Sequence, residues 1–600
     1  MSVLFQTRKC LFKKPFNNTF CKYVFLRKNS DVPRKFVTFD EIVAQRRLEA
    51  QRSLVVQVNS ESSFNELYGY CSKYASINDI HHYKNSGGEN FMLIEFESEE
   101  NLKEVLKSCC SHNKDHDLIS VQSPFVWFRA AAGKKEKLVA NGKNLAVKNG
   151  IEIIKEDVLY EELMNCETVS DQIQLLYDRT TLNDLGMRLR YMVARQLEVI
   201  FSSLYTNVRV QPFGSTVNGF GRMGCDLDLI LTNTLTEEMT AAGRRLVFQE
   251  KRCEGGRGGA RHMELAGALL ELRVPGAARV VRVLNARVPI VKYAHDYTDL
   301  HCDLCYNNLS GAYMSELLWQ LGELAPRARA LAVLVRRWAA RAGLTQPHPG
   351  RWVTNFPLTL LVLFFLQQSH AHLLPPLNLL VSCAGKEDTR IAEENLKCTF
   401  VRDLNKLPPE SYGQNDDDLQ TLLFKFFEFY SQFDFENKAI SINEGRAIRK
   451  PNSLPLYIVN PLEQSLNVSR NVSHEECERL RLEVRNAAWH LESCPARSAE
   501  GWGALGLLER RAAPQLRRLL RLGTSHRLVS MRDLFREDDE PSVEGVRSKL
   551  RTLVKTDTEV ETGVKEMKSE MVKEKRSDRM KFKNTQTANE VYRIRRGKIV

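Results

Sequence analysis

The chain has 600 residues, which excludes a single hydrophobic core and predicts roughly three to five structural units of ~100 to 200 residues each. Apolar residues make up 43% of it, enough for real cores, but the longest apolar run, from Leu358 to Leu366, is shorter than the ~18 residues that cross a bilayer, which argues against membrane insertion. The net charge of +12 and the pI near 9.0 suggest a polyanionic partner, with nucleic acid as the leading candidate and a solvated basic surface as the alternative.

The two ends of the chain are biased in composition. Residues 1–35 contain seven lysines and arginines before the first acidic residue, Asp31. This bias fits a mitochondrial presequence, and hence a location in the matrix, although a disordered basic tail is the alternative. Residues 496–600 form a basic C-terminal extension that we expect to be partly disordered.

Residues 53–130 show a βαββαβ rhythm of apolar segments, which is the element order of a ferredoxin-like RNA recognition motif. Such domains stack RNA bases on aromatic side chains of the sheet. The third strand keeps Phe91 and Phe96 but has Leu93 where a second stacking aromatic is expected, and the first strand offers Gln57. We therefore expect a degenerate domain that serves protein contact or weak RNA contact.

A lysine-rich linker is predicted over residues 131–160, and the apolar spacing over 161–204 predicts two helices that belong to a helical central domain. A segment rich in Gly, Ala and Arg covers residues 243–282. It is interpreted either as an RGG-like RNA-binding segment or, preferably, as a surface insertion before a helix near Met263 to Leu272. Two strands of a hairpin are predicted over Val280 to Tyr293 and Leu300 to Tyr306.

Three aspartates are the main candidates for chemistry. Asp226 and Asp228 alternate with leucines in a predicted strand that follows a glycine-serine turn, Gly214-Ser215, so both carboxylates should project from one face. Asp303 stands between apolar residues of a later predicted strand, where a carboxylate is costly unless it is paired or bound to a cation. Placed together, the three carboxylates predict a cation site.

This pattern suits nucleotidyl transfer. Magnesium prefers oxygen ligands, and two such ions could activate an attacking hydroxyl, orient it toward an α-phosphate and neutralise the pyrophosphate leaving group. Gly214 would let the backbone approach a triphosphate, while the hydroxyl and amide of Ser215 could bind its oxygens.

Gly214-Ser215, ten further residues and then Asp226-x-Asp228, with a later strand aspartate, resemble the signature of the DNA polymerase beta-like nucleotidyltransferase superfamily. The resemblance implies Mg²⁺ or Mn²⁺ as cofactor and Asp226, Asp228 and Asp303 as its ligands. It also implies an α+β fold, with a palm of mixed sheet and helices at 205–307 set into a helical central domain completed by residues 308–495.

Further segments resemble the noncanonical poly(A) polymerases and terminal uridylyltransferases. By this resemblance, Asn308 contacts the nucleotide ribose, Arg336 contacts the triphosphate and Phe356 stacks on the base. One turn after Arg336, where relatives often carry another basic residue, this chain has Ala340, which leaves the phosphate-binding detail in doubt.

The segment Leu456 to Val468 is similar to the nucleotide recognition motif of this family, in which Asn467 takes a binding role. Uridylyltransferase relatives commonly carry a histidine directly before this asparagine, where it can hydrogen-bond uracil. Here that position is Leu466, which cannot make the contact, so adenine is the expected base.

The whole arrangement resembles the mitochondrial branch of the family. It implies an enzyme that adds adenylates from ATP to RNA 3′ ends and forms a homodimer through its N-terminal domain. The alternatives are a terminal uridylyltransferase and a catalytically silent RNA-binding scaffold.

Overall fold

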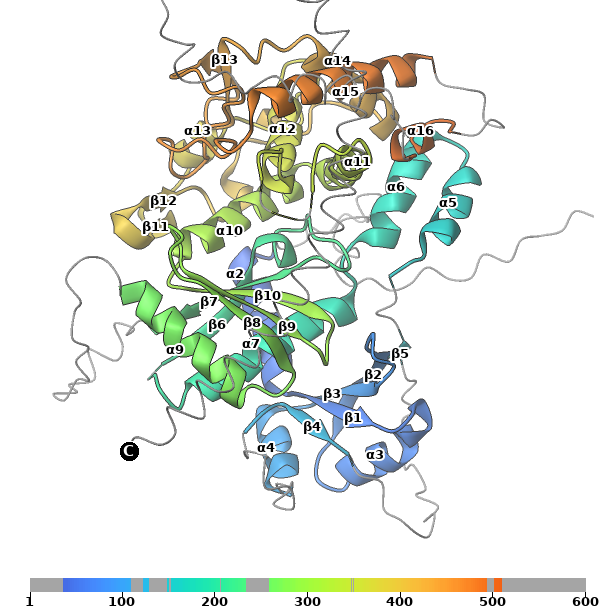
Figure 1. Cartoon of the computed structure of the whole chain (residues 1–600), viewed down its shortest axis with the longest axis vertical. Helices are drawn as coiled ribbons and strands as arrows, with labels where there is room; N and C mark the ends of the chain where they lie inside the picture. Colours follow the sequence, from blue (N-terminus) through green and yellow to red (C-terminus); the bar gives the residue numbers. More distant parts are fainter. Residues whose placement is uncertain are drawn as a thin grey trace, which may run out of the picture. The chain divides into compact units, whose positions relative to one another are not determined.

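The computed structural model describes residues 36–108, 122–128, 148–149, 153–205, 207–233, 258–346, 348, 350–493 and 501–509. All of them fall within the first of two units of the chain, Met1–Arg511. They form an α+β fold with two five-stranded sheets and a group of packed helices (Figure 1). The predicted presequence, most of the predicted linker and nearly all of the predicted C-terminal extension lie outside the described residues.

The N-terminal sheet has the strand order β4-β1-β3-β2-β5, in which β1 runs parallel to β4 and antiparallel to β3. The chain order of its elements agrees with the predicted rhythm; they are β1 (Ser53–Val58), α3 (Phe64–Cys71), β2 (Ile77–Lys84), β3 (Asn90–Phe96), α4 (Glu99–Lys107), β4 (Phe125–Trp127) and β5 (Lys148–Asn149). Alternate residues of the strands, among them Val56, Met92 and Ile94, are buried against α3 and α4. This face forms a separate small core.

The opposite face of the N-terminal sheet packs against a second sheet of the same chain. Phe91 and Leu93 share a hydrophobic core with residues of that second sheet. The ring of Phe91 lies 5.6 Å from that of Tyr297, and the Tyr83 hydroxyl donates a hydrogen bond of 3.1 Å to the Tyr297 carbonyl. The face on which an RNA recognition motif stacks bases is therefore engaged in an intramolecular protein contact.

The second sheet has the strand order β6-β7-β10-β9-β8, in which β7 and β10 are parallel and the other neighbours are antiparallel. Its strands are β6 (Arg209–Phe213), β7 (Leu227–Thr232), β8 (Ala277–Val283), β9 (Ile290–His295) and β10 (Leu300–Tyr306). The predicted strand from Val280 to Tyr293 is thus two strands, because the chain leaves β8 at Val283 and turns before Ile290. Helices α7 (Asp184–Phe201) and α9 (Gly258–Arg273) pack on this sheet.

The remaining helices bury one large hydrophobic core (Figure 1). They are α5 (Glu156–Met164), α6 (Val169–Thr180), α10 (Leu309–Leu324), α11 (Arg327–Arg341), α12 (Asn355–Leu366), α13 (Leu377–Ser382), α14 (Leu419–Ser431), α15 (His474–Glu492) and α16 (Leu505–Leu508). Residues 161–204, predicted as two helices, contribute to three. Residues 501–509, assigned from the sequence to the extension, belong to this core because Trp502, Leu505 and Leu507 are buried in it.

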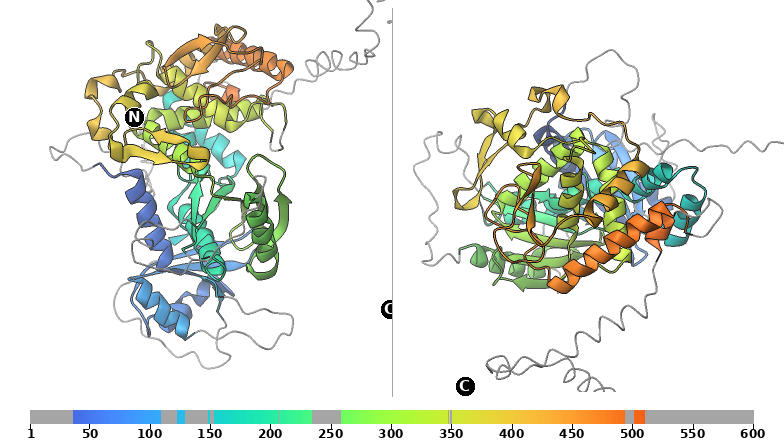
Figure 2. Two further views of the ribbon diagram at one scale, coloured as in Figure 1. Left: turned by 90° about the vertical axis from the view of Figure 1, so that its left-hand side faces the viewer. Right: turned by 90° about the horizontal axis from the view of Figure 1, so that it is seen from above.

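Helix α2 (Phe39–Gln51) runs from the helices of the C-terminal half toward the N-terminal sheet, which the chain enters at β1 (Figure 2). Its first turn contacts α10 through the Phe39 ring, 5.6 Å from the Trp319 ring, and contacts strand β11 (Thr389–Ile391) through an ion pair of Asp40 with Arg390. Farther along, Arg46 binds Asp184 of α7 at 2.7 Å. None of the helices in the described part of the chain is long and apolar enough to span a membrane.

Candidate active site

Two of the three predicted carboxylates lie side by side on the second sheet. Asp228 of β7 and Asp303 of β10 are direct partners in the parallel register of these strands. The sequence had suggested that Asp226 lies within the strand. In the structure it lies one residue before β7, and its side chain is exposed. Parallel pairing of β7 and β10 therefore brings together residues separated by more than seventy positions in the chain.

The surroundings of Asp228 carry more negative than positive charge. Burial, followed by repulsion from Asp303 and Asp226, raises the pKa of Asp228 from 3.8 to about 7. The ammonium of Lys292, on β9, lowers it slightly and forms an ion pair with Asp303. Within the described ranges, no group of three His, Cys, Asp or Glu side chains is arranged to hold a metal ion as it stands. A cation that approached Asp228 would relieve the repulsion that raises its pKa.

The Gly214-Ser215 turn is pressed against Asp228. It forms a short 3-10 helix (Gly214–Thr216) directly after β6, and Gly214 has a φ of 66°, in the left-handed region that favours glycine. A Cβ atom at this position would lie 2.3 Å from Asp228 Oδ2. The Gly214 amide donates a 2.7 Å hydrogen bond to Ser315 Oγ of α10, so this amide is already engaged within the protein.

Arg190 holds the chain just before Asp226, and sequence reasoning missed it. This arginine of α7 is 2% exposed, and it donates hydrogen bonds of 2.7 Å to the Cys225 carbonyl and 3.1 Å to the Gly186 carbonyl. Burying a guanidinium is costly unless it is hydrogen-bonded, so these contacts tie the position of Asp226 to α7. The signal in the sequence is an arginine among the apolar positions of an amphipathic helix.

Arg336 braces the loop that joins the glycine-serine turn to Asp226. Its guanidinium donates a hydrogen bond to the carbonyl of Phe220. Burial, together with repulsion from Arg222, lowers its pKa to about 10, although Cys225 acts in the opposite direction. The predicted triphosphate contact is thus placed under the loop, and Arg222, which was not singled out from the sequence, adds positive charge beside it.

The other predicted nucleotide contacts come from three separate elements. Asn308, the N-cap residue of α10, accepts a 3.2 Å hydrogen bond from Ser310 Oγ and lies with Phe213 against Gly311, next to the sheet. Phe356 is in the first turn of α12, partly buried against the helical core.

Asn467 is 8% exposed, and both the oxygen and the nitrogen of its side-chain amide are hydrogen-bonded within the protein. Its Oδ1 accepts from the amides of Ile458 and Ser469 at 3.0 and 2.9 Å, while its Nδ2 donates to the Leu456 carbonyl at 2.9 Å. In this structure Asn467 shapes the segment around Leu466 rather than offering a free amide.

The mixed sheet, the glycine-serine turn and the adjoining carboxylates are those of a nucleotidyltransferase. In agreement, residues 169–323 match the family model described as "Poly(A) RNA polymerase, mitochondrial-like, central palm domain", and residues 418–464 match that of "Cid1 family poly A polymerase". The chain is 46% identical to the mitochondrial poly(A) RNA polymerase of Drosophila melanogaster over 469 residues, 76% of either chain. It therefore belongs to the mitochondrial poly(A) RNA polymerase family.

Further relatives agree with this assignment. The human mitochondrial poly(A) RNA polymerase is 33% identical over 481 residues, 78% of this chain and 81% of the human one. The crystal structure of mtPAP in complex with UTP superposes with a TM-score of 0.71 at 30% identity, covering 79% of this chain and all of that one. The structure of mtPAP with ATPγS gives 0.70 at 29% identity with the same coverage.

Proposed function

We propose that the site formed by Asp226, Asp228 and Asp303 catalyses the transfer of AMP from ATP to the 3′ ends of RNA. The observation that carries the proposal is the direct pairing of Asp228 with Asp303 beside the Gly214 turn, in a chain of the mitochondrial poly(A) RNA polymerase family. The 3′ hydroxyl would attack the α-phosphate of ATP, forming a phosphodiester bond and releasing pyrophosphate.

A divalent cation fits this site, and the three aspartates are the residues that would hold it. The raised pKa of Asp228 reflects burial and neighbouring negative charge, both of which a bound cation would offset. Bound Mg²⁺ or Mn²⁺ would supply charge neutralisation and a lower pKa for the attacking hydroxyl. The ammonium of Lys292 pairs with Asp303, so it would have to give up this carboxylate to a bound cation.

The protein's own residues would bind and orient the two substrates. Ser215, partly exposed in the turn, would donate its hydroxyl to a triphosphate oxygen, and Arg336 would keep the following loop in place through the Phe220 carbonyl. Asn308 would contact the ribose and Phe356 the base. Asn467 would act indirectly, by holding the backbone that presents Leu466.

Extension assays with each nucleotide offered separately test the activity and the choice of base. We expect ATP to extend an RNA primer at least roughly tenfold more efficiently than UTP, because Leu466 offers uracil no hydrogen bond. Extension is the informative readout, since the related mtPAP has been crystallised with UTP as well as with ATPγS. A preference for UTP would favour a terminal uridylyltransferase, and ATP binding without extension would favour a silent scaffold.

Cation binding should depend on pH through Asp228. With a pKa of about 7, Asp228 is mostly protonated at pH 6 and ionised at pH 8, and only the ionised form is a good ligand. One competing proton predicts a roughly tenfold weaker affinity for Mn²⁺ at pH 6 than at pH 8. Titration calorimetry measures this ratio, and equal affinities at the two pH values would show that Asp228 does not ligate the cation.

We further infer that the N-terminal unit is a degenerate RNA-recognition-like domain. Its strand order supports this, and the packing of Phe91 and Leu93 onto the second sheet leaves that face without a base platform. If the chain forms a homodimer through this unit, the contact must use its helices or sheet edges. The basic presequence and the mitochondrial relatives support a location in the matrix.

A further inference from the structure

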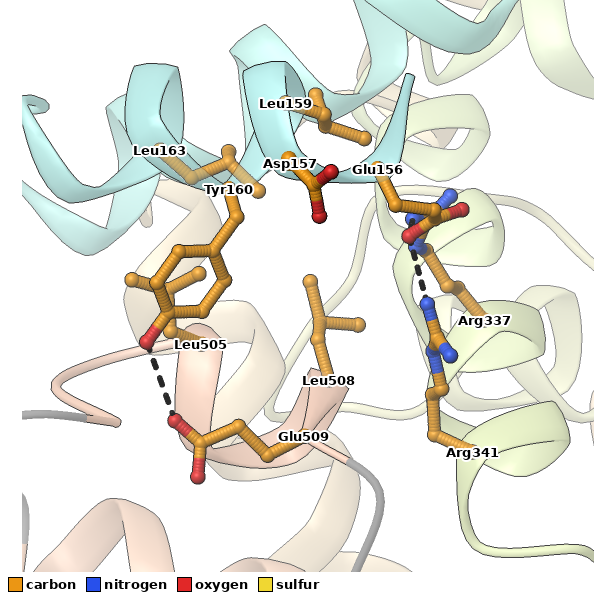
Figure 3. A pocket seen from close by; sticks show the side chains of 10 residues that line it. All are labelled: Glu156, Asp157, Leu159, Tyr160, Leu163, Arg337, Arg341, Leu505, Leu508 and Glu509. Carbon is orange, nitrogen blue, oxygen red and sulfur yellow. Dashed lines mark hydrogen bonds and ion pairs between the residues drawn. The ribbon is translucent and has the colours of Figure 1, made fainter. Parts of the chain in front are cut away.

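A pocket of about 310 Å³ lies away from the three aspartates, between α5, α11 and residues 505–509 (Figure 3). Arg337 and Arg341 line one side of it, and Tyr160 and Glu509 line the other. Four leucines also line the pocket, namely Leu159, Leu163, Leu505 and Leu508. The pocket thus combines two arginines with apolar, aromatic and acidic side chains.

The two guanidinium groups of the basic wall share one carboxylate. The Nη2 atoms of Arg337 and Arg341 lie 2.5 and 2.6 Å from the same oxygen of Glu156, whose side chain is 62% exposed. Arg337 Nε is buried and has no hydrogen-bond partner among the residues that the structure describes. Burial lowers the pKa of Arg337, as does repulsion from Arg341 and Arg222, although the Glu156 carboxylate raises it. A second anion would therefore find two guanidinium groups and an exchangeable counterion.

The other wall suits a planar base. The Tyr160 side chain is 37% exposed, and its hydroxyl donates to Glu509 Oε1 at 3.4 Å. This bond keeps the ring at the edge of the pocket, where an aromatic face can stack on a base. Asp157 points into the same space and offers oxygens that could accept hydrogen bonds from an exocyclic amine (Figure 3).

The pocket is connected to the loop that carries Asp226. Ile153, three residues before Glu156, lies against Gly224. A Cβ atom added at Gly224 would be 3.1 Å from Ile153 Cδ1. On α11, Arg336 adjoins Arg337 in sequence and binds the Phe220 carbonyl of the same loop. A strand of RNA that leaves the candidate active site would thus have the arginines of α11 available beside it as cationic contacts.

We propose that this pocket binds one nucleoside 5′-phosphate unit, with the phosphate on Arg337 and Arg341 in place of Glu156 and the base on Tyr160. A single guanidinium can donate two parallel hydrogen bonds to one phosphate group. A phosphate could therefore displace the exposed Glu156 carboxylate, which binds both arginines through one oxygen. The ligand is either a residue of the RNA chain or a free nucleotide. The assignment to an RNA residue rests on the proposed adenylyl transfer, because that function makes RNA a substrate. The assignment to a free nucleotide does not depend on it.

The test measures binding to the full chain in EDTA, where no extension occurs, using a fluorescent 15-residue oligoadenylate and, separately, AMP. We expect Arg341→Gln to weaken binding roughly fivefold to tenfold through the lost phosphate contact. Tyr160→Leu, which leaves the charge unchanged, should weaken it by a similar factor through lost stacking. Glu156→Gln should strengthen it roughly threefold, because the competing carboxylate is removed.

The control variants are Arg446→Gln and Glu444→Gln, an exposed ion pair of the same type on another part of the chain, which should leave both affinities unchanged. If the pocket variants change the affinity for oligoadenylate alone, the pocket binds RNA. If they change the affinity for AMP in the same way, the pocket binds free nucleotides. Equal affinities in all variants, or a loss in Glu156→Gln as large as in Arg341→Gln, would overturn the proposal. Extension of the primer by wild-type protein is measured alongside, so that failure of the adenylyl transfer is recognised separately.

Discussion

Replacing Asp228 by asparagine is expected to reduce adenylate addition at least roughly 1,000-fold, since the lost carboxylate is central to the proposed cation site. The same change should raise the thermal stability of the metal-free protein at pH 8. Folding raises the pKa of Asp228 from 3.8 to about 7, so this group costs stability as the pH rises through that interval, and the cost is complete above it. Asparagine removes the charge and hence the cost. Primer extension and thermal unfolding measure the two effects.

A matched control is available on the same sheet. Asp296 follows β9, is half exposed and pairs with Arg279 at 2.8 Å, so Asp296→Asn removes an equivalent charge without touching the site. It should retain extension close to that of the wild-type chain. Substantial extension by Asp228→Asn, together with a lower unfolding temperature, would mean that Asp228 serves the fold rather than the reaction.

Gly214→Ala is expected to cause the second-largest loss, roughly 100-fold or more in extension. The alanine would have to adopt a φ of 66°, and its Cβ would clash with Asp228 Oδ2 at 2.3 Å. Relief of the clash requires Asp228 or the turn to move, and either movement changes the position of the carboxylate relative to the bound triphosphate. Extension assays on the variant measure the loss.

Gly88→Ala separates backbone strain from the clash. Gly88 has a similar φ of 79°, but nothing lies within 4 Å of the added Cβ, and this glycine lies in the turn between β2 and β3. We expect both variants to lose a comparable amount of stability from the left-handed backbone, roughly 1 kcal/mol, while only Gly214→Ala loses activity. Equal activity in the two variants would contradict the close approach of the turn to Asp228.

Features that depend on local pattern were predictable from the sequence. The alternation of apolar residues after Asp226 predicted β7, and Leu227, Leu229 and Leu231 are all buried as expected. The element order of the N-terminal sheet was likewise visible in short apolar runs. The family of the chain followed from the spacing of the glycine-serine turn and the aspartates, and the comparisons confirmed it.

Features that depend on tertiary contact were not predictable. The parallel pairing of β7 with β10 sets the register of Asp228 and Asp303, and no local pattern specifies it. Lys292 faces Asp303 only because β9 pairs with β10, and Arg190 reaches Cys225 across two elements. The burial of Trp502 also depends on distant helices, so residues 501–509 were assigned to a solvated extension.

The most direct test of the central claim is an anomalous diffraction measurement on crystals grown with Mn²⁺ and a non-hydrolysable ATP analogue. The account predicts an anomalous peak within ligand distance of Asp226, Asp228 and Asp303, with Lys292 turned away from Asp303. A peak elsewhere, or bound nucleotide with no manganese at these three carboxylates, would contradict it.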